Sequence, residues 1–281
     1  MASDSHTGNP ARIAFIGGGN MARSLIGGLI GNGVPVDRLS ASEPNADLRA
    51  ALARDFGMAV CAENIQAAES ADVLLLAVKP QVMKNVCIGL REVAQARKPL
   101  VVSIAAGIRI DQLDGWFGGD MAIVRCMPNT PALIGAGATG ACANARCTDA
   151  QREMAQNILS AAGITAWIAD EALMDTVTAL SGSGPAYFFL LVEALVDAAV
   201  AQGLPEEIAR ALATQTALGA GRMLREDGAA PAELRRRVTS PAGTTQAALD
   251  SFAASQFNAI VAAAVATATQ RGRELSAQLD C

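Results

Sequence analysis

Histidine is almost absent from this chain of 281 residues, because its single histidine, His6, stands near the N-terminus. A Ser-His-Asp triad and a histidine general acid or base are therefore excluded from the body of the chain, and no metal site is expected. Tyrosine is equally scarce, with Tyr187 alone, and the lysines are confined to Lys79, Lys84 and Lys98. Side chains that donate protons in catalysis are thus few.

Positive charge is also in short supply, with 22 Lys and Arg residues against 27 Asp and Glu and a net charge of −5. Proteins that bind nucleic acid generally carry a basic surface, so no nucleic-acid partner is expected. The six cysteines include no Cys-x-x-Cys pair and are typical of small core residues in a cytosolic protein. We therefore expect a cytoplasmic protein.

Long hydrophobic runs are missing, although 51% of the residues are hydrophobic. The longest unbroken run, Ala259–Ala266, is far shorter than the ~20 residues that a membrane-spanning helix needs, and Tyr187–Val200 is interrupted by Glu193 and Asp197. Residues 1–10 lack the pattern of a signal peptide and are predicted to form a disordered tail. The apolar residues are therefore expected in a core or a subunit interface, with no membrane partner.

Residues 11–170 alternate short apolar runs with amphipathic segments such as Met21–Asn32 and Ala46–Arg54, which predicts βαβ units and a parallel-rich sheet. The runs VLLLAV and LVVSI are apolar on both faces, as central parallel strands are. The predicted strands are Arg12–Ile16, Arg38–Ser42, Met58–Val60, Val73–Val78, Leu100–Ile104 and Ala122–Cys126, and Ala138–Ala143 and Ile164–Ile168 are candidates to extend the sheet.

From residue 171 to residue 281 the strand-like runs stop and helix formers dominate, which predicts an all-α second domain. Its helices carry few charges, so we expect them to bury surface against another subunit. The predicted helices are Ala172–Leu180, Ala186–Gln202, Pro205–Arg225, Pro231–Val238 and Thr245–Leu279.

A glycine-rich loop follows the first predicted strand. The segment from Gly17 to Ala22 fits Gly-x-Gly-x-x-Ala between a strand and a helix, the arrangement that binds a dinucleotide pyrophosphate. Gly17 makes the tight turn, and Gly19 lets the backbone approach the phosphates. The alternative is a glycine-rich turn without a ligand.

Glu43 comes at the end of the second predicted strand, where an acidic side chain commonly binds a ribose 2′-hydroxyl and favours NAD. Glu43 would repel a 2′-phosphate, whereas Arg23 or another nearby base would offset that repulsion. The alternative is a solvated loop carboxylate. Both NADPH and NADH therefore remain candidate cofactors.

Hydride transfer to a ketone commonly uses a histidine, lysine or tyrosine as the proton donor. The scarcity of these three residue types favours a substrate that arrives already activated. A protonated imine needs hydride delivery and positioning more than it needs a strong general acid.

Several segments together resemble the pyrroline-5-carboxylate reductase family. They are FIGGGNMA (15–22), AVKPQ (77–81), VSIAAG (102–107), RCMPNTPAL (125–133), LSGSGPAYFF (180–189) and ELRRRVTSPAGTTQAAL (233–249). The resemblance implies a Rossmann-like N-terminal domain (11–170) and a helical C-terminal domain (171–281) that forms homodimers, often assembled into decamers. It also implies hydride transfer from NAD(P)H to the C=N bond of 1-pyrroline-5-carboxylate, which gives L-proline.

The resemblance also implies which residues bind the cofactor. The pyrophosphate is expected at the loop, the adenosine at the end of the second strand, and the nicotinamide at the edge of the sheet. These residues are Gly17, Gly18, Gly19, Asn20 and Met21 for the pyrophosphate, Ser42, Glu43, Asn45 and Asn64 for the adenosine, and Val78, Lys79, Ala105, Ala106 and Asn129 for the nicotinamide.

The loop SPAGTT (240–245) is the implied substrate site, in which the amides of Gly243 and Thr244 hold the substrate carboxylate and the Thr245 hydroxyl contacts the ring nitrogen. Glu171 matches an acidic residue near the substrate amine in the family. For Thr245 the alternative is a plain helix cap, and for Glu171 it is a carboxylate at a helix start.

Two positions depart from the family pattern. Ala242 stands where the family often has glycine, so a positive φ at this position would cost about 1 kcal/mol. Arg237 stands where some members have asparagine. It belongs either to a solvated helix face or to a cofactor-phosphate contact across a subunit interface.

Overall fold

A computed structural model describes residues 11–278 of the chain. The predicted tail 1–10, with His6, and Cys281 lie outside the described residues. The chain divides into two compact units. The first runs to Gly182 and takes in the chain again from Ala268, and the second is Ser183–Thr267.

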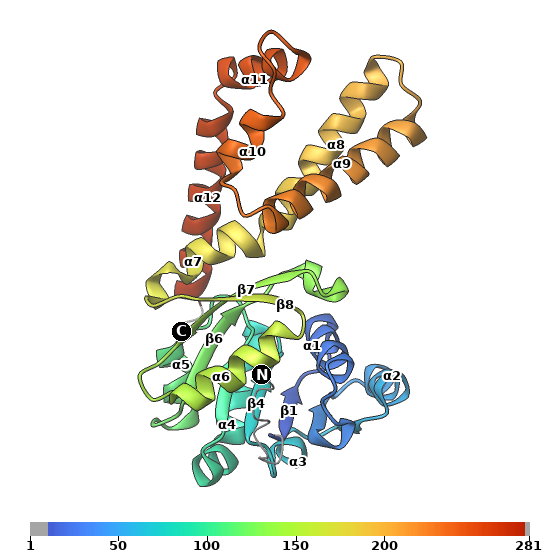
Figure 1. Ribbon diagram of the computed structural model, residues 1–281. Coiled ribbons are helices and arrows are strands. Elements are labelled where there is room, and N and C mark those ends of the chain that lie inside the picture. Colours follow the sequence, from blue (N-terminus) through green and yellow to red (C-terminus); the bar gives the residue numbers. More distant parts are fainter. Residues whose placement is uncertain (1–10, 279–281) are drawn as a thin grey trace, which may run out of the picture. The chain divides into compact units, whose positions relative to one another are not determined.

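The first unit is built on one eight-stranded sheet with the order β3-β2-β1-β4-β5-β6-β7-β8 (Figure 1). Neighbours from β3 to β6 are parallel, β7 runs antiparallel to β6, and β8 is parallel to β7. The strands are β1 (Ile13–Ile16), β2 (Leu39–Ser42), β3 (Ala59–Cys61), β4 (Val73–Leu76), β5 (Leu100–Ser103), β6 (Ile123–Met127), β7 (Gly137–Ala143) and β8 (Gly163–Trp167). The parallel-rich sheet is confirmed, and both candidate extensions are strands.

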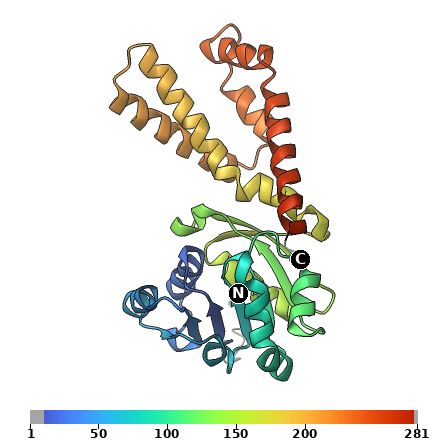
Figure 2. The same cartoon turned by 180° about the vertical axis from the view of Figure 1, so that it is seen from behind.

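Helices cover both faces of this sheet, which is why every residue of β1, β4 and β5 is buried. One face packs against α1 (Asn20–Gly31), α2 (Ala46–Phe56) and α6 (Asp149–Ser160), which are seen in Figure 1. The opposite face packs against α3 (Asn64–Ala68), α4 (Pro80–Arg97) and α5 (Ile110–Phe117), and Figure 2 shows it from behind. Short 3₁₀ turns, η1 (Val36–Arg38) and η2 (Thr130–Ile134), precede β2 and follow β6.

The chain leaves the sheet through three short helical pieces rather than through the single helix predicted over Ala172–Leu180. They are η3 (Glu171–Leu173), α7 (Met174–Val177) and the π-helical turn η4 (Thr178–Gly182). A π-turn commonly marks a functional site in a helix. Here it stands immediately before the second unit.

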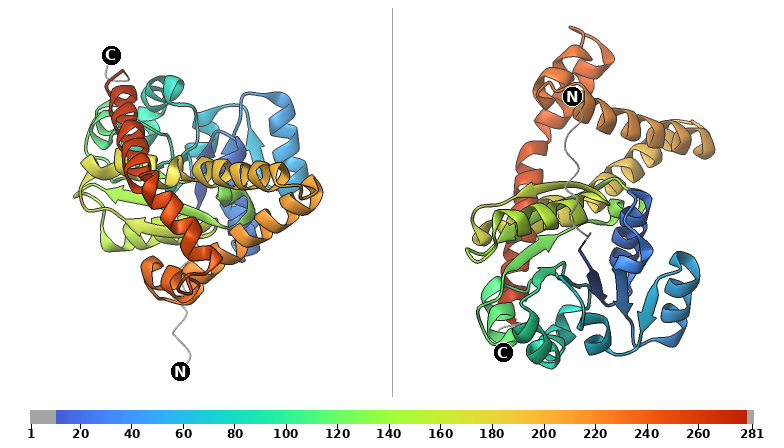
Figure 3. Two further views of the ribbon diagram at one scale, coloured as in Figure 1. Left: turned by 90° about the horizontal axis from the view of Figure 1, so that it is seen from above. Right: turned by 60° about the horizontal axis from the view of Figure 1, so that its bottom comes forward.

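The second unit consists of helices alone, as the sequence predicted. They are α8 (Gly184–Ala201), α9 (Glu206–Glu226), α10 (Pro231–Arg237), α11 (Thr244–Ala254) and α12 (Phe257–Gln278), whose last residues belong to the first unit. Helices α8 and α9 form a hairpin and lie side by side in both views of Figure 3.

The prediction of one continuous helix over Thr245–Leu279 is wrong within the described residues, which end at Gln278. Helices α11 and α12 are bent by 55° at a break between them. Gln256 adopts a left-handed conformation there (φ 55°), which ends α11, and the rings of Phe252 and Phe257 meet across the bend with centroids 5.3 Å apart. Neither proline nor glycine stands at the break, so the composition carried no signal of it.

Large apolar side chains are exposed on the second unit, including Phe188, Phe189 and Leu190 at 64–67% exposure. By length and composition alone, the helical run Glu171–Ala201 would suffice to cross a membrane. An apolar helix surface of this kind equally suits a subunit interface, where it would be buried.

Candidate active site

The phosphate loop joins β1 to α1 in the tight conformation that the motif predicts. Gly17 has a φ of 102°, and its amide donates to the carbonyl oxygen of Ser42 at 2.9 Å. A Cβ on Gly17 would lie 2.7 Å from the carbonyl oxygen of Ala77, so only glycine fits between β1 and β4. The loop therefore lies where the strand order reverses, at the point where this class of sheet binds nucleotides.

Gly19 is the N-cap of α1 and brings no side chain to the first-turn amides of the helix. A Cβ placed on Gly19 would meet no atom within 4 Å, so the space in front of these amides is open. The first-turn amides of Asn20 and Met21 have no acceptor inside the helix and attract an anion. The loop thus fits a dinucleotide pyrophosphate.

The adenosine side of the predicted site is built around Glu43, which is 8% exposed. Its Oε2 accepts the amide of Gly18 and its Oε1 the amide of Asn45, both at 2.9 Å. Beside it, the Ser42 hydroxyl donates to Oδ1 of Asn64 at 2.7 Å. The four predicted adenosine residues therefore lie together at the ends of β2 and β3.

The predicted nicotinamide side follows β4 and β5. Val78 and Lys79 come directly after β4, and Lys79 is the N-cap of α4. Ala105 is buried and its amide donates to the Ser103 hydroxyl at 3.4 Å, whereas Ala106 is exposed. Because parallel strands end at one edge, these residues share that edge with the phosphate loop.

Asn129 is buried and uses both ends of its side-chain amide. Its Oδ1 accepts the amide of Ala138 at 2.8 Å, and its Nδ2 donates to the carbonyl oxygen of Ser181 at 3.0 Å. The side chain thus ties the segment after β6 to β7 and to the π-turn η4. A direct contact of Asn129 with the nicotinamide stays a prediction.

Glu171 accepts hydrogen bonds from Arg125 and from the amide of Ile110, the first residue of α5, both at 2.9 Å. The guanidinium of Arg125 also lies 3.8 Å from Asp175, and its side chain is only 5% exposed. The sequence reasoning did not single out Arg125. A sequence feature that could have found Arg125 is the single charged residue inside an otherwise apolar strand, since β6 has the sequence IVRCM.

The loop between α10 and α11 carries the predicted substrate residues. Ala242 has a φ of 59°, and the amide of Gly243 donates to the carbonyl oxygen of Ser240 at 3.1 Å. A Cβ on Gly243 would lie 2.4 Å from Oγ of Ser240. The positive φ considered for Ala242 is thus confirmed, whereas Gly243 has a φ of −83° that other residues also adopt.

Helix α11 begins at Thr244, and its N-cap Gly243 offers no side chain to the first turn. The amides of Thr244, Thr245 and Gln246 therefore have no acceptor within the helix. Such a helix start binds a carboxylate well. Because the amide of Gly243 already donates within the turn, the geometry favours the amides that follow it.

Arg237, on α10, is engaged by neighbouring carboxylates of its own unit. Its Nη1 lies 3.0 Å from Asp227 and its Nε 3.1 Å from Glu233. Hydrogen bonds from Arg236 and Arg237 hold the pKa of Glu233 below its usual value. The contact of Arg237 with a cofactor phosphate stays a prediction.

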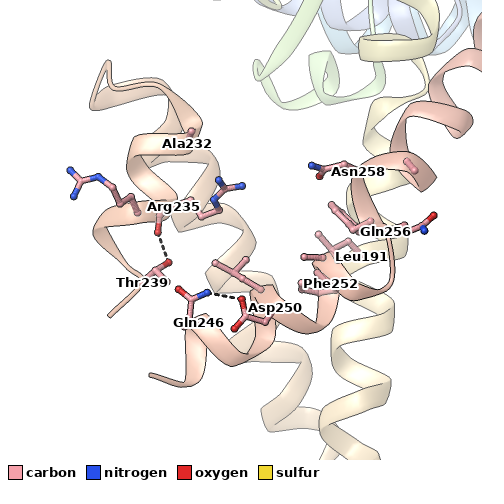
Figure 4. A pocket seen from close by; sticks show the side chains of 14 residues that line it. Leu191, Ala232, Arg235, Thr239, Gln246, Asp250, Phe252, Gln256 and Asn258 are labelled. Atoms are coloured by element: carbon pink, nitrogen blue, oxygen red, sulfur yellow. Dashed lines mark hydrogen bonds between the residues drawn. The ribbon is translucent and has the colours of Figure 1, made fainter. Parts of the chain in front are cut away.

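An open cavity of about 990 Å³ lies beside this loop within the second unit. Figure 4 shows Thr239, which precedes the loop, and Gln246, which follows it, on the cavity wall, where their side chains bond Arg235 and Asp250. The rest of the lining is largely apolar and comes from α8, α10, α11 and α12, including Leu191, Leu249, Phe252 and Phe257.

Comparisons with known proteins agree with this architecture. Residues 171–275 match the family model for pyrroline-5-carboxylate reductase dimerisation, and residues 12–107 match that for coenzyme F420-dependent NADP oxidoreductases. The pyrroline-5-carboxylate reductase of Pseudomonas aeruginosa is 54% identical over 95% of this chain and 98% of its own length. A solved pyrroline-5-carboxylate reductase from Coxiella burnetii is 40% identical, with a TM-score of 0.93 over 95% of this chain and 99% of that chain. The Plasmodium falciparum structure with NADP bound is 28% identical, with a TM-score of 0.81 over 95% of this chain and 98% of that chain.

Proposed function

The chain belongs to the pyrroline-5-carboxylate reductase family, and we propose that its phosphate loop, its sheet edge and its 240–245 loop carry out the reaction of that family. The chain is an NAD(P)H-dependent oxidoreductase that reduces 1-pyrroline-5-carboxylate to L-proline, the last step of proline biosynthesis. The observation that carries this assignment is 54% identity over 95% of the chain.

The first unit binds the cofactor. The open space at Gly19 and the first-turn amides of Asn20 and Met21 support pyrophosphate binding at α1. Val78, Lys79, Ala105, Ala106 and Asn129 are assigned to the nicotinamide side, on the edge of the sheet. When bound, the reduced nicotinamide supplies the hydride that the C=N carbon accepts.

The 240–245 loop binds the substrate. The carboxylate is held by the amides of Thr244 and Thr245 at the start of α11, with Gly243 shaping the turn in front of them. The Thr245 hydroxyl contacts the ring nitrogen of the protonated imine. The neighbouring carbon gains the hydride, the electron pair of the C=N π bond becomes the nitrogen lone pair, and the resulting amine then takes a proton from solvent. Positioning and electrostatic fit therefore do most of the catalysis, as the scarcity of acid and base side chains requires.

Glu171 has a separate role near the substrate amine. Its carboxylate is held by Arg125 and by the amide of Ile110, so its orientation is set before substrate arrives. Arg237 is assigned to a contact with a cofactor phosphate across the subunit interface, and its bonds to Asp227 and Glu233 orient the guanidinium within its own unit.

The family assignment establishes that the chain forms oligomers through its helical region and acts on a small molecule. We extend this to a homodimer assembled into a decamer in the cytoplasm. The domains are assigned as 11–170 for the dinucleotide and 171–281 for dimerisation and substrate, which the family match over 171–275 supports. Light scattering of the purified protein measures the assembly, and a mass of a dimer alone would contradict the decamer.

The assay for the proposed function follows reduced-cofactor absorbance with saturating 1-pyrroline-5-carboxylate. Wild type is expected to oxidise the cofactor and form proline. Thr245→Ala is expected to lower turnover by about tenfold or more while leaving the cofactor dissociation constant unchanged, because one hydrogen bond to the reacting group is lost. Thr165→Ala on β8 is the matched control. Unchanged turnover in Thr245→Ala would remove this residue from the mechanism. Absence of oxidation by folded, cofactor-binding protein would exclude the substrate.

A further inference from the structure

The carboxylate of Glu43 is fixed at the end of β2 by backbone groups on two sides. One oxygen accepts the amide of Gly18 in the phosphate loop and the other accepts the amide of Asn45 before α2, both at 2.9 Å. The side chain is 92% buried, so it has little room to turn away when a ligand binds. In a sheet of this class, the end of the second strand faces the adenosine ribose.

A helix start usually has free amides that bind a phosphate. At the start of the neighbouring helix α2, these amides are already bonded. Oδ1 of Asn45 already accepts the amides of Asp47 and Leu48, both at 3.0 Å. Asp47 also adds a second negative charge in the first turn of the helix. The helix start is therefore satisfied from within and is unfavourable to a further anion.

Two arginines on the flanking helices, Arg23 on α1 and Arg49 on α2, make contacts that do not involve the Glu43 carboxylate. Arg23 forms an ion pair with Asp55, and its Cζ lies 5.1 Å from the ring centroid of Phe56. Arg49 donates through Nη1 to the carbonyl oxygens of Glu43 and Pro44 at 2.8 and 3.0 Å, so it braces the backbone and not the carboxylate. The sequence left open an offset of Glu43 by Arg23 or another nearby base. Arg23 is paired with Asp55, and Arg49 is the nearby base, which contacts the backbone carbonyl of Glu43 and not its carboxylate.

We propose that Glu43, held in place by Gly18 and Asn45, selects against the cofactor 2′-phosphate and makes this reductase prefer NADH over NADPH. The fixed carboxylate accepts a hydrogen bond from a ribose 2′-hydroxyl and repels a phosphate in the same place. The proposal rests on the proposed function only in requiring that a dinucleotide binds at the phosphate loop.

Equilibrium binding without substrate tests the proposal independently of turnover. The fluorescence of NADH and of NADPH is titrated with wild type and with Glu43→Gln, which keeps the size of the side chain and removes its charge. Wild type is expected to bind NADH about tenfold more tightly than NADPH, and Glu43→Gln to reduce that ratio to about one or below. Added salt should also narrow the ratio in wild type, since screening weakens repulsion.

Glu69→Gln is the matched control, because Glu69 is exposed and lies at the far end of α3 from the adenosine residues. It should leave both dissociation constants as in wild type. Asp47→Asn removes the second, exposed negative charge and leaves the hydrogen bonds of Glu43 in place. It should lower the preference for NADH over NADPH, measured as the ratio of the two dissociation constants, by about twofold. It keeps the test decisive if Glu43→Gln folds poorly.

The proposal would be overturned if wild type bound NADPH as tightly as NADH. It would also be overturned if the ratio of the two dissociation constants were the same in folded Glu43→Gln as in wild type. Either result would leave the reductase function intact. Folded wild type that binds neither dinucleotide would overturn both.

Discussion

Arg125 of β6 donates from Nη1 to Oε1 of Glu171 over 2.9 Å, and this bond joins the sheet to the segment that leads out of the first unit. Only 5% of the arginine side chain is exposed, and Asp175 lies on its other side at 3.8 Å. Buried ion pairs add little net stability, but removing one partner leaves the other charges uncompensated.

Arg125→Met is therefore expected to lower the free energy of unfolding by about 3 kcal/mol, because Glu171 and Asp175 lose their cation. Urea unfolding at one protein concentration measures the change. Arg97→Met, on an exposed position in the last turn of α4, should change it by no more than about 0.5 kcal/mol. If Arg125→Met lowered the free energy of unfolding by no more than Arg97→Met does, the ion pair would not contribute to the stability of the fold.

Gly19 and Gly17 are expected to respond in opposite ways to an added methyl group. Gly19→Ala meets no atom within 4 Å, so stability should hold while the methyl group fills the pyrophosphate space and weakens cofactor binding about tenfold or more. Gly17→Ala, with φ of 102° and a backbone oxygen 2.7 Å away, should lose about 2 kcal/mol of stability. Thermal unfolding and cofactor titration of both variants separate the two effects, and equal cofactor affinity in Gly19→Ala and wild type would contradict the role of the loop.

Ala242→Gly should stabilise the protein by roughly 0.5–1 kcal/mol, because glycine adopts the observed φ of 59° without a Cβ clash. Ala248→Gly, at an exposed position in the middle of α11, is the matched control and should destabilise by about 1 kcal/mol. Both changes are measured as shifts of the urea midpoint. Destabilisation by Ala242→Gly would mean that the loop adopts a different backbone in solution.

Burial raises the pKa of Cys87 to about 12, and burial also raises the pKa of Cys126 above its usual value. The thiol of Cys87 ionises near 9.0 when the chain is unfolded, so between pH 9 and about 12 the folded state binds more protons than the unfolded state. The contribution of such a thiol to the free energy of unfolding should therefore be fully present below pH 9. Above pH 9 the free energy of unfolding should fall by about 1.4 kcal/mol per pH unit for each such thiol. Between pH 8 and 10 the free energy of unfolding should depend less on pH in Cys87→Ala than in wild type. Parallel plots of this free energy against pH for the two proteins would refute the linkage.

The strands of the first unit could be predicted to within two residues because their apolar runs are short and separated by amphipathic segments, and because β1, β4 and β5 are buried on both faces. The glycine pattern at 17–22 also located the phosphate loop correctly from local sequence. The turn needs a residue with a positive φ at Gly17, and glycine adopts that conformation readily. The break at Gln256 could not be predicted, because it depends on Phe252 and Phe257 meeting in space and not on a helix-breaking residue.

The sheet, the helical second unit, the phosphate loop and the family follow from the amino-acid sequence, because each depends on local pattern or on motifs in order along the chain. The partners of Glu43, Asn129 and Glu171 are visible in the folded chain and not in the sequence. Their contacts reach Gly18, Ser181 and Arg125, which are 25, 52 and 46 residues away in the chain. No local pattern encodes such pairings, since they arise only when the strands stand side by side and burial forces each polar group to find a partner.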